Sequence, residues 1–124
     1  MEFNKIIINN KANIMPYVFV TSYIPNDKVE QAAKIHLDTI QEFRKKIRGL
    51  SKEIIPNAVI ARKDCMEITG VHDIKEGKLG EFLKLQSEVM TNYLKVPGYR
   101  FVTEVRFKVT EALAMLGMKA IEPE

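Results

Sequence analysis

Apolar side chains recur at every second position in several short segments of the chain, and every three to four positions in two long segments. Residues 17–24 are rich in β-branched and aromatic side chains and predict a first strand. Its two alternating sets are Tyr17, Phe19 and Tyr23 on one face, and Val18, Val20 and Ile24 on the other. Both faces should therefore be covered, which favours a central position in a sheet.

A first helix is predicted to begin near Asp27 and to end near Arg48. Asp27 and Glu30 have the spacing of a capping box, and Gly49 tolerates the left-handed conformation that ends many helices. The apolar stripe consists of Val29, Ala32, Ala33, His36, Ile40, Phe43 and Ile47. This period is typical of a helix that packs one face against a core.

Two further strands are predicted at residues 54–60 and 65–71. Pro56 cannot donate a ladder hydrogen bond, so the first of these is expected at an edge of the sheet. Lys63 and Asp64 are expected to form the hairpin connection, which makes the two strands antiparallel.

The second half of the chain repeats the pattern of helix and strand. A helix is predicted over residues 78–94, ended by Pro97 and Gly98. A strand follows at 99–109, and Thr110 is expected to cap a short last helix that ends at Gly117. The strand has Tyr99, Phe101, Val105, Phe107 and Val109 on one face, and Arg100, Glu104, Arg106 and Lys108 on the other.

The order of these elements, βαββαβ, predicts an α+β fold of the ferredoxin-like kind. Right-handed crossovers would give a four-stranded antiparallel sheet with two helices on one face. The other face would be bare, and burying its apolar side chains against a second copy is favourable. We therefore expect a homodimer or a higher even-numbered oligomer.

The length of 124 residues suits a single domain, predicted over residues 15–124. Residues 1–14, with asparagines around Ile6, Ile7 and Ile8, are interpreted as an extension, which would be an extra edge strand, a partner-binding arm or a loose tail. No apolar run is long enough to span a bilayer or to serve as a signal peptide, so no membrane partner and a cytoplasmic location are expected.

The net charge of +3 comes from one cluster, Arg44, Lys45, Lys46 and Arg48, without which 15 basic residues face 16 acidic ones. Cations near a helix end are stabilised by the helix dipole, and only Phe43 lies nearby as an aromatic residue, so no nucleic acid is expected. Cys65 is the single cysteine, so an internal disulfide is impossible, and it is interpreted as a small strand residue.

The order of elements over Tyr17–Val109 and the tail Thr110–Gly117 resemble the dimeric α+β barrel superfamily. That superfamily includes antibiotic-biosynthesis monooxygenases, muconolactone isomerases and many small uncharacterised members. The resemblance implies a pocket between sheet and helices, and the monooxygenases act on aromatic polyketides without a cofactor. It carries over no catalytic motif, and no cofactor is expected.

The candidate catalytic residues are His36, His72 and Tyr93. His36 lies on the inner stripe of the first helix, where a partly buried imidazole has a tunable pKa. The alternative is a hydrogen-bonded histidine at the edge of the core. His72 ends a strand beside Asp73, and its spacing to His36 and to acidic residues follows no recognised ligand pattern, so no metal site is expected.

Aromatic side chains on predicted inward faces indicate a pocket for an apolar or planar ligand, with the alternative that they simply fill the core. The candidate lining is Tyr17, Phe19, Tyr23, His36, Ile40, Phe82, Gln86, Tyr93 and Phe101. Three functions stay open at this point: a dimer that binds a small molecule, a cofactor-independent monooxygenase or isomerase that uses His36 and a tyrosine, and a protein-interaction or assembly module.

Overall fold

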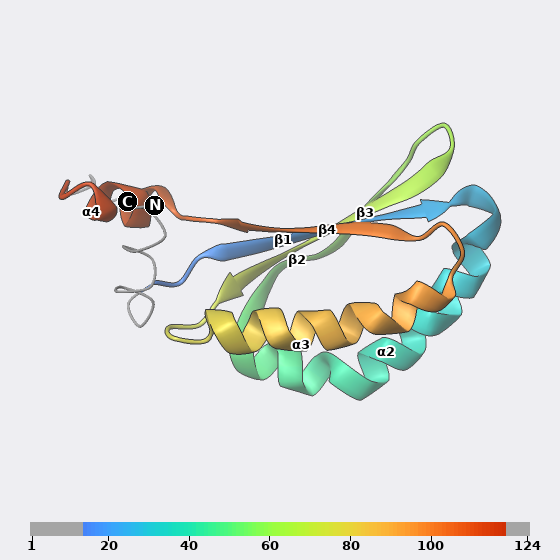
Figure 1. Cartoon of the computed structure of the whole chain (residues 1–124), viewed down its shortest axis with the longest axis horizontal. Coiled ribbons are helices and arrows are strands. Elements are labelled where there is room, and N and C mark those ends of the chain that lie inside the picture. Colours follow the sequence, from blue (N-terminus) through green and yellow to red (C-terminus); the bar gives the residue numbers. More distant parts are fainter. Residues whose placement is uncertain (1–13, 119–124) are drawn as a thin grey trace.

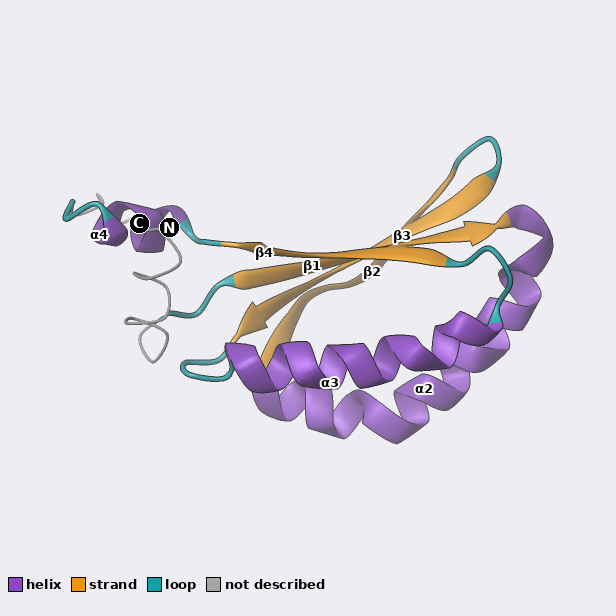
Figure 2. Cartoon of the chain, viewed as in Figure 1, coloured by secondary structure: helices purple, strands orange, loops and turns teal. Residues whose placement is uncertain are grey.

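The computed structural model describes residues 14–118, and within them strands and helices follow in the order β1, α2, β2, β3, α3, β4, α4 (Figure 2). Their bounds are β1 Tyr17–Pro25, α2 Val29–Leu50, β2 Ser51–Ala61, β3 Cys65–Ile74, α3 Leu79–Thr91, β4 Arg100–Arg106 and α4 Val109–Met115. Short 3₁₀ turns, η2 (Asn26–Lys28) and η3 (Asn92–Lys95), precede α2 and follow α3. The fold is α+β. Apart from Ile14, the extension predicted at residues 1–14 lies outside the described residues.

The four strands form one antiparallel sheet in the order β2-β3-β1-β4. β1 is central, as its two apolar faces predict, and Phe19 pairs with Val71 of β3 on one side and Glu104 of β4 on the other. β2 is an edge strand and pairs antiparallel with β3, as Pro56 and the hairpin connection predict.

Both long helices, α2 and α3, cover the same face of the sheet, whereas α4 lies beyond the end of the sheet, apart from them (Figure 1). The core between the sheet and these helices includes Val18, Phe43, Phe82 and Ile74. Val18 is 0% exposed and Phe82 only 1%. The helices are therefore held by apolar side chains that the strand and helix periodicities place on facing surfaces.

Strand alternation divides β1 sharply between the two faces. Val18, Val20, Ser22 and Ile24 are buried toward the helices, while the residues between them are only partly buried. The register places Arg100, Val102, Glu104 and Arg106 of β4 on the same face as the partly buried set of β1. We call this face, which α2 and α3 do not cover, the open face.

The ends of α2 differ from the prediction. The described structure shows no side-chain cap at the start of α2, so the predicted capping box of Asp27 and Glu30 is not formed, and η2 leads into the helix instead. At the other end α2 continues through Gly49, which does not have a positive φ. The chain turns at Ser51, which is extended and whose hydroxyl donates to the Ile47 carbonyl at 3.1 Å. No left-handed residue is needed where an extended residue enters a strand directly.

The last helix and the strand before it also differ from the prediction. β4 ends at Arg106 rather than at 109, and α4 begins at Val109. The Lys108 amide donates to Glu111 Oε1 at 3.1 Å, so Glu111 and not Thr110 satisfies the start of this helix. Gly117 has a φ of 74° and ends α4, as predicted.

Candidate functional site

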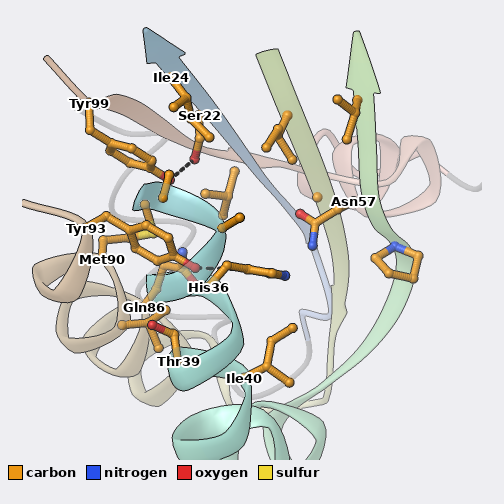
Figure 3. A pocket seen from close by; sticks show the side chains of 18 of the residues that line it. Ser22, Ile24, His36, Thr39, Ile40, Asn57, Gln86, Met90, Tyr93 and Tyr99 are labelled. Carbon is orange, nitrogen blue, oxygen red and sulfur yellow. Dashed lines mark hydrogen bonds between the residues drawn. The ribbon is translucent and has the colours of Figure 1, made fainter. Parts of the chain in front are cut away.

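A cavity of about 370 Å³ lies between the helix-covered face of the sheet and the two long helices. Val20 of β1 and Ile68 of β3 line it from the sheet. Ile40 of α2 and Met90 of α3 line it from the helices (Figure 3). A volume in the range of small-molecule sites, with mostly apolar walls and a few polar groups, is the usual composition of a ligand pocket.

His36 and Tyr93 form a hydrogen-bonded pair inside this cavity, with His36 Nδ1 lying 3.0 Å from the Tyr93 hydroxyl (Figure 3). Tyr93 belongs to η3, which continues α3 and packs against α2, and it is 7% exposed. Next to it Asn92 Nδ2 donates to Thr39 Oγ1 at 3.3 Å, and Thr39 donates to the Ile35 carbonyl at 2.7 Å. The pair is thus held by a short polar network that joins α2 to η3.

Burial sets the protonation of both members of this pair. Desolvation lowers the pKa of His36 below 6.5, because the charged imidazolium loses its hydration. Desolvation also raises the pKa of Tyr93 above 10.0, and hydrogen bonding by Thr39 partly offsets this. At neutral pH the pair is therefore a neutral imidazole beside a neutral phenol. A neutral imidazole can accept a proton, as a general base requires.

Tyr99 adds a second aromatic ring to the same wall. Its ring stacks on that of Tyr93 with centroids 5.0 Å apart and an angle of 20° between the planes. Its hydroxyl donates to Ser22 Oγ at 2.6 Å, which fixes the ring against β1 (Figure 3). Desolvation raises the pKa of Tyr99 to about 12, with the hydrogen bond to Ser22 opposing the shift. The stacked rings place two aromatic side chains together in the wall of the cavity.

His72 lies in the same cavity with partners of its own. Its Nδ1 is 3.3 Å from Ser51 Oγ, and its ring centroid is 5.0 Å from that of Phe82. Burial lowers its pKa, while the charge of Glu53 raises it. His72 therefore lies within β3, beside Ser51 and Phe82, and not at the end of the strand as the sequence predicts. Among residues 14–118, no cluster of three or more His, Cys, Asp or Glu side chains is placed to hold a metal ion.

The structure does not bring all of the sequence-predicted pocket residues together. His36, Ile40, Gln86 and Tyr93 line the cavity. Phe82 is buried in the core, and Phe101 lies on β4, where it is 37% exposed.

Tyr17, Phe19 and Tyr23 lie outside the cavity, because strand alternation puts them on the open face. Each ring there is covered by a cation: Lys108 Nζ lies 5.1 Å from the ring centre of Tyr17, Arg106 4.1 Å from Phe19 and Arg100 5.0 Å from Tyr23. These three aromatic residues are therefore part of the other surface of the sheet.

Ser22 and Thr39 are two polar cavity residues that the sequence prediction missed. Ser22 belongs to the buried alternating set of β1, between Val20 and Ile24. Because buried hydroxyl groups are almost always hydrogen-bonded, a serine at such a position indicates a polar partner nearby. Thr39 lies three residues after His36, on the same side of α2, and is 3% exposed. The helical spacing of Thr39 from His36 could have placed it on the inner face of α2. It was left out because the stripe was defined by apolar side chains.

Comparison with known proteins returns no match among family models, curated proteins or solved structures. No helix within residues 14–118 is both long enough and apolar enough to cross a membrane.

Proposed function

We propose that this protein binds a small, flat and largely apolar molecule between its sheet and its helices. The observation that carries this proposal is the cavity of about 370 Å³ in a domain of this size, with a stacked pair of tyrosines along one wall. Aromatic walls favour planar ligands, which stack on them and bury apolar area at the same time.

The polar groups of the cavity can orient such a ligand by hydrogen bonding. The buried side chain of Gln86 and the His36–Tyr93 pair lie on the helix side, and Asn57 lines the cavity from β2 (Figure 3). A few convergent donors and acceptors in apolar walls fix the pose of a ligand, whereas the apolar area supplies most of the affinity. A ligand with one or two polar substituents on a flat body suits this arrangement.

The test is a fluorescence titration with N-phenyl-1-naphthylamine, a neutral flat probe that emits strongly in apolar surroundings. The wild type is expected to show a saturable signal with one probe per chain. Ile68→Trp places a larger side chain on the sheet side of the cavity and should weaken binding at least tenfold. Leu37→Trp is the matched control, since Leu37 is on α2 but 67% exposed and outside the cavity. Equal binding by both variants would refute the proposal.

We also propose that the fold is the ferredoxin-like one and that two copies pack their open faces together, as in dimeric α+β barrels. The strand order β2-β3-β1-β4 and the position of both long helices on one face support this arrangement. Apolar side chains that remain exposed on the open face support pairing, namely Ile55 at 41%, Ile60 at 47% and Val102 at 47%. Burying them against a second copy removes apolar surface from water.

A second candidate function is cofactor-independent oxidation or isomerisation, and the His36–Tyr93 hydrogen bond of 3.0 Å favours it. A neutral His36 would remove a proton from a bound carbon acid, and Tyr93 would orient the imidazole. Anthrone with O₂ is a suitable probe reaction, because loss of a C10 proton gives an anion that O₂ oxidises to anthraquinone, with the second oxygen atom leaving as water. A bell-shaped pH profile that His36→Ala abolishes would support this function, whereas unchanged turnover would exclude His36 from it.

A further inference from the structure

A second depression adjoins the cavity where the end of α2 meets the start of β2 and the end of β3. Arg44, Glu53 and Pro56 line both the cavity and the depression, so the two lie next to each other. The depression is completed by Arg48, Ser51, Lys52 and Lys75. We call Arg44, Arg48, Lys52 and Lys75 the basic mouth of the cavity.

The charges at the basic mouth do not cancel. Glu53 is the one carboxylate of the described residues that lines the depression, and its Oε1 lies 4.0 Å from Arg48 Nε. Lys75 Nζ donates to the Arg48 carbonyl at 3.1 Å, close to the end of α2. Arg44 forms no ion pair with a carboxylate of residues 14–118. A positive surplus is therefore left beside the cavity, and Arg44 is its innermost member.

The helix dipole accounts for only part of this cluster. Arg48 and Lys75 are close to the last carbonyls of α2, where cations are stabilised. Arg44 lies more than one turn earlier, and it lines the apolar cavity itself. A cation at the rim of an apolar pocket is favourably placed for an anionic group on whatever molecule occupies that pocket.

The opposite part of the cavity is aromatic. Along α2 the lining runs from Val29 to Ile47, which are five turns apart, or about 27 Å at 1.5 Å per residue. Tyr99 and Tyr93 provide the aromatic part of the lining, and Arg44 lies toward the Ile47 end. The site is thus elongated, with two tyrosines toward one end and positive charge at the other.

We propose that the ligand is an anionic amphiphile, with a flat apolar body against Tyr93 and Tyr99 and a carboxylate-like or sulfonate-like group at Arg44. This inference rests on the proposed binding function and adds the chemical class of the ligand. The guanidinium of an arginine binds such oxyanions through parallel N–H donors and remains charged at all relevant pH values. The apolar body supplies most of the affinity, and the anion fixes the direction in which the ligand enters.

The experiment compares two probes that share one ring system. N-phenyl-1-naphthylamine is neutral, and 8-anilinonaphthalene-1-sulfonate carries an added sulfonate. Dissociation constants are measured for the full chain, for Arg44→Gln, and for Lys45→Gln, which removes the same charge from the adjacent exposed residue that lines neither hollow. Arg44→Gln should raise the dissociation constant of the sulfonate about three- to fivefold, the upper part of the range for an exposed ion pair. It should leave that of the neutral probe within twofold.

The outcomes separate this inference from the function on which it rests. Equal weakening of both probes by Arg44→Gln, or equal effects of Arg44→Gln and Lys45→Gln on the sulfonate, would overturn the anionic assignment while the cavity stands as an apolar site. Failure of both probes to bind the wild type would overturn both proposals. Raising the salt concentration should weaken the sulfonate more than the neutral probe, because screening acts on the charged contact alone.

Discussion

The hydroxyl of Tyr93 and Nδ1 of His36, 57 residues apart in the chain, share a hydrogen bond of 3.0 Å inside the cavity. The bond joins η3 to α2. It therefore both holds the two helical segments together and orients the polar groups of the site. Its strength can be measured without any knowledge of the ligand.

Tyr93→Phe should lower the free energy of unfolding by about 1 kcal/mol, because the partly buried imidazole loses its partner. Urea unfolding at neutral pH measures the change. Tyr23→Phe is the control, since that ring lies on the open face under Arg100, and it should change stability by less than about 0.5 kcal/mol. Equal effects of the two variants would show that the hydrogen bond contributes nothing.

Stability should fall as the pH drops below about 6.5. Burial lowers the folded-state pKa of both His36 and His72 below 6.5, so between the folded and the unfolded pKa the unfolded state binds more protons. Each histidine therefore stabilises the fold above pH 6.5 and loses that contribution as the pH falls through its folded pKa. Urea unfolding at pH 7.5, 6.5 and 5.5 checks this. His36→Gln/His72→Gln should show a shallower dependence, and an unchanged slope would contradict the account.

Gly49→Ala should stabilise the protein, by up to about 1 kcal/mol, because Gly49 is helical and a Cβ there would meet no atom within 4 Å. Gly98→Ala is the contrasting variant. Gly98 has a φ of +78°, and a Cβ would come to 2.9 Å of Pro25 Cγ, so this change should cost about 1 kcal/mol or more. Thermal unfolding distinguishes the two. A destabilising Gly49→Ala would indicate that α2 ends earlier, in a left-handed residue.

Val102→Arg should disrupt the proposed dimer. Val102 is 47% exposed on the open face, and an added charge there would have to be buried in a sheet-to-sheet interface. Light scattering with size exclusion should give twice 14.2 kDa for the wild type and a mass near 14.2 kDa for the variant. Leu37→Arg, on the outer side of α2, should remain dimeric. A monomeric wild type would refute the pairing of open faces.

Much of the fold follows from local patterns in the sequence. The central position of β1 follows from its two apolar faces, and the edge position of β2 follows from Pro56. These features depend on side chains that are close in sequence. The end of α2 cannot be predicted in this way. Whether Gly49 adopts a left-handed conformation depends on how directly Ser51 enters β2.

The site was harder to predict because it depends on which face of a strand meets the helices. Tyr17 and Phe19 are as apolar as Val18 and Val20, so the periodicity of β1 cannot say which set lines a cavity. The cations Arg106 and Lys108 mark the face on which Phe19 and Tyr17 lie. They come to lie over these rings only when β4 pairs with β1, which local sequence does not show. His36 and Tyr93 could be placed on inner stripes, but their hydrogen bond depends on how α2 packs against η3.

The most direct measurement is a crystal structure of the protein with N-phenyl-1-naphthylamine bound. The account predicts density for the probe between the sheet and the long helices, with its rings against Tyr93 and Tyr99 and within reach of Ile68. Probe density only on the open face, or a cavity filled by side chains with no room for the probe, would contradict it.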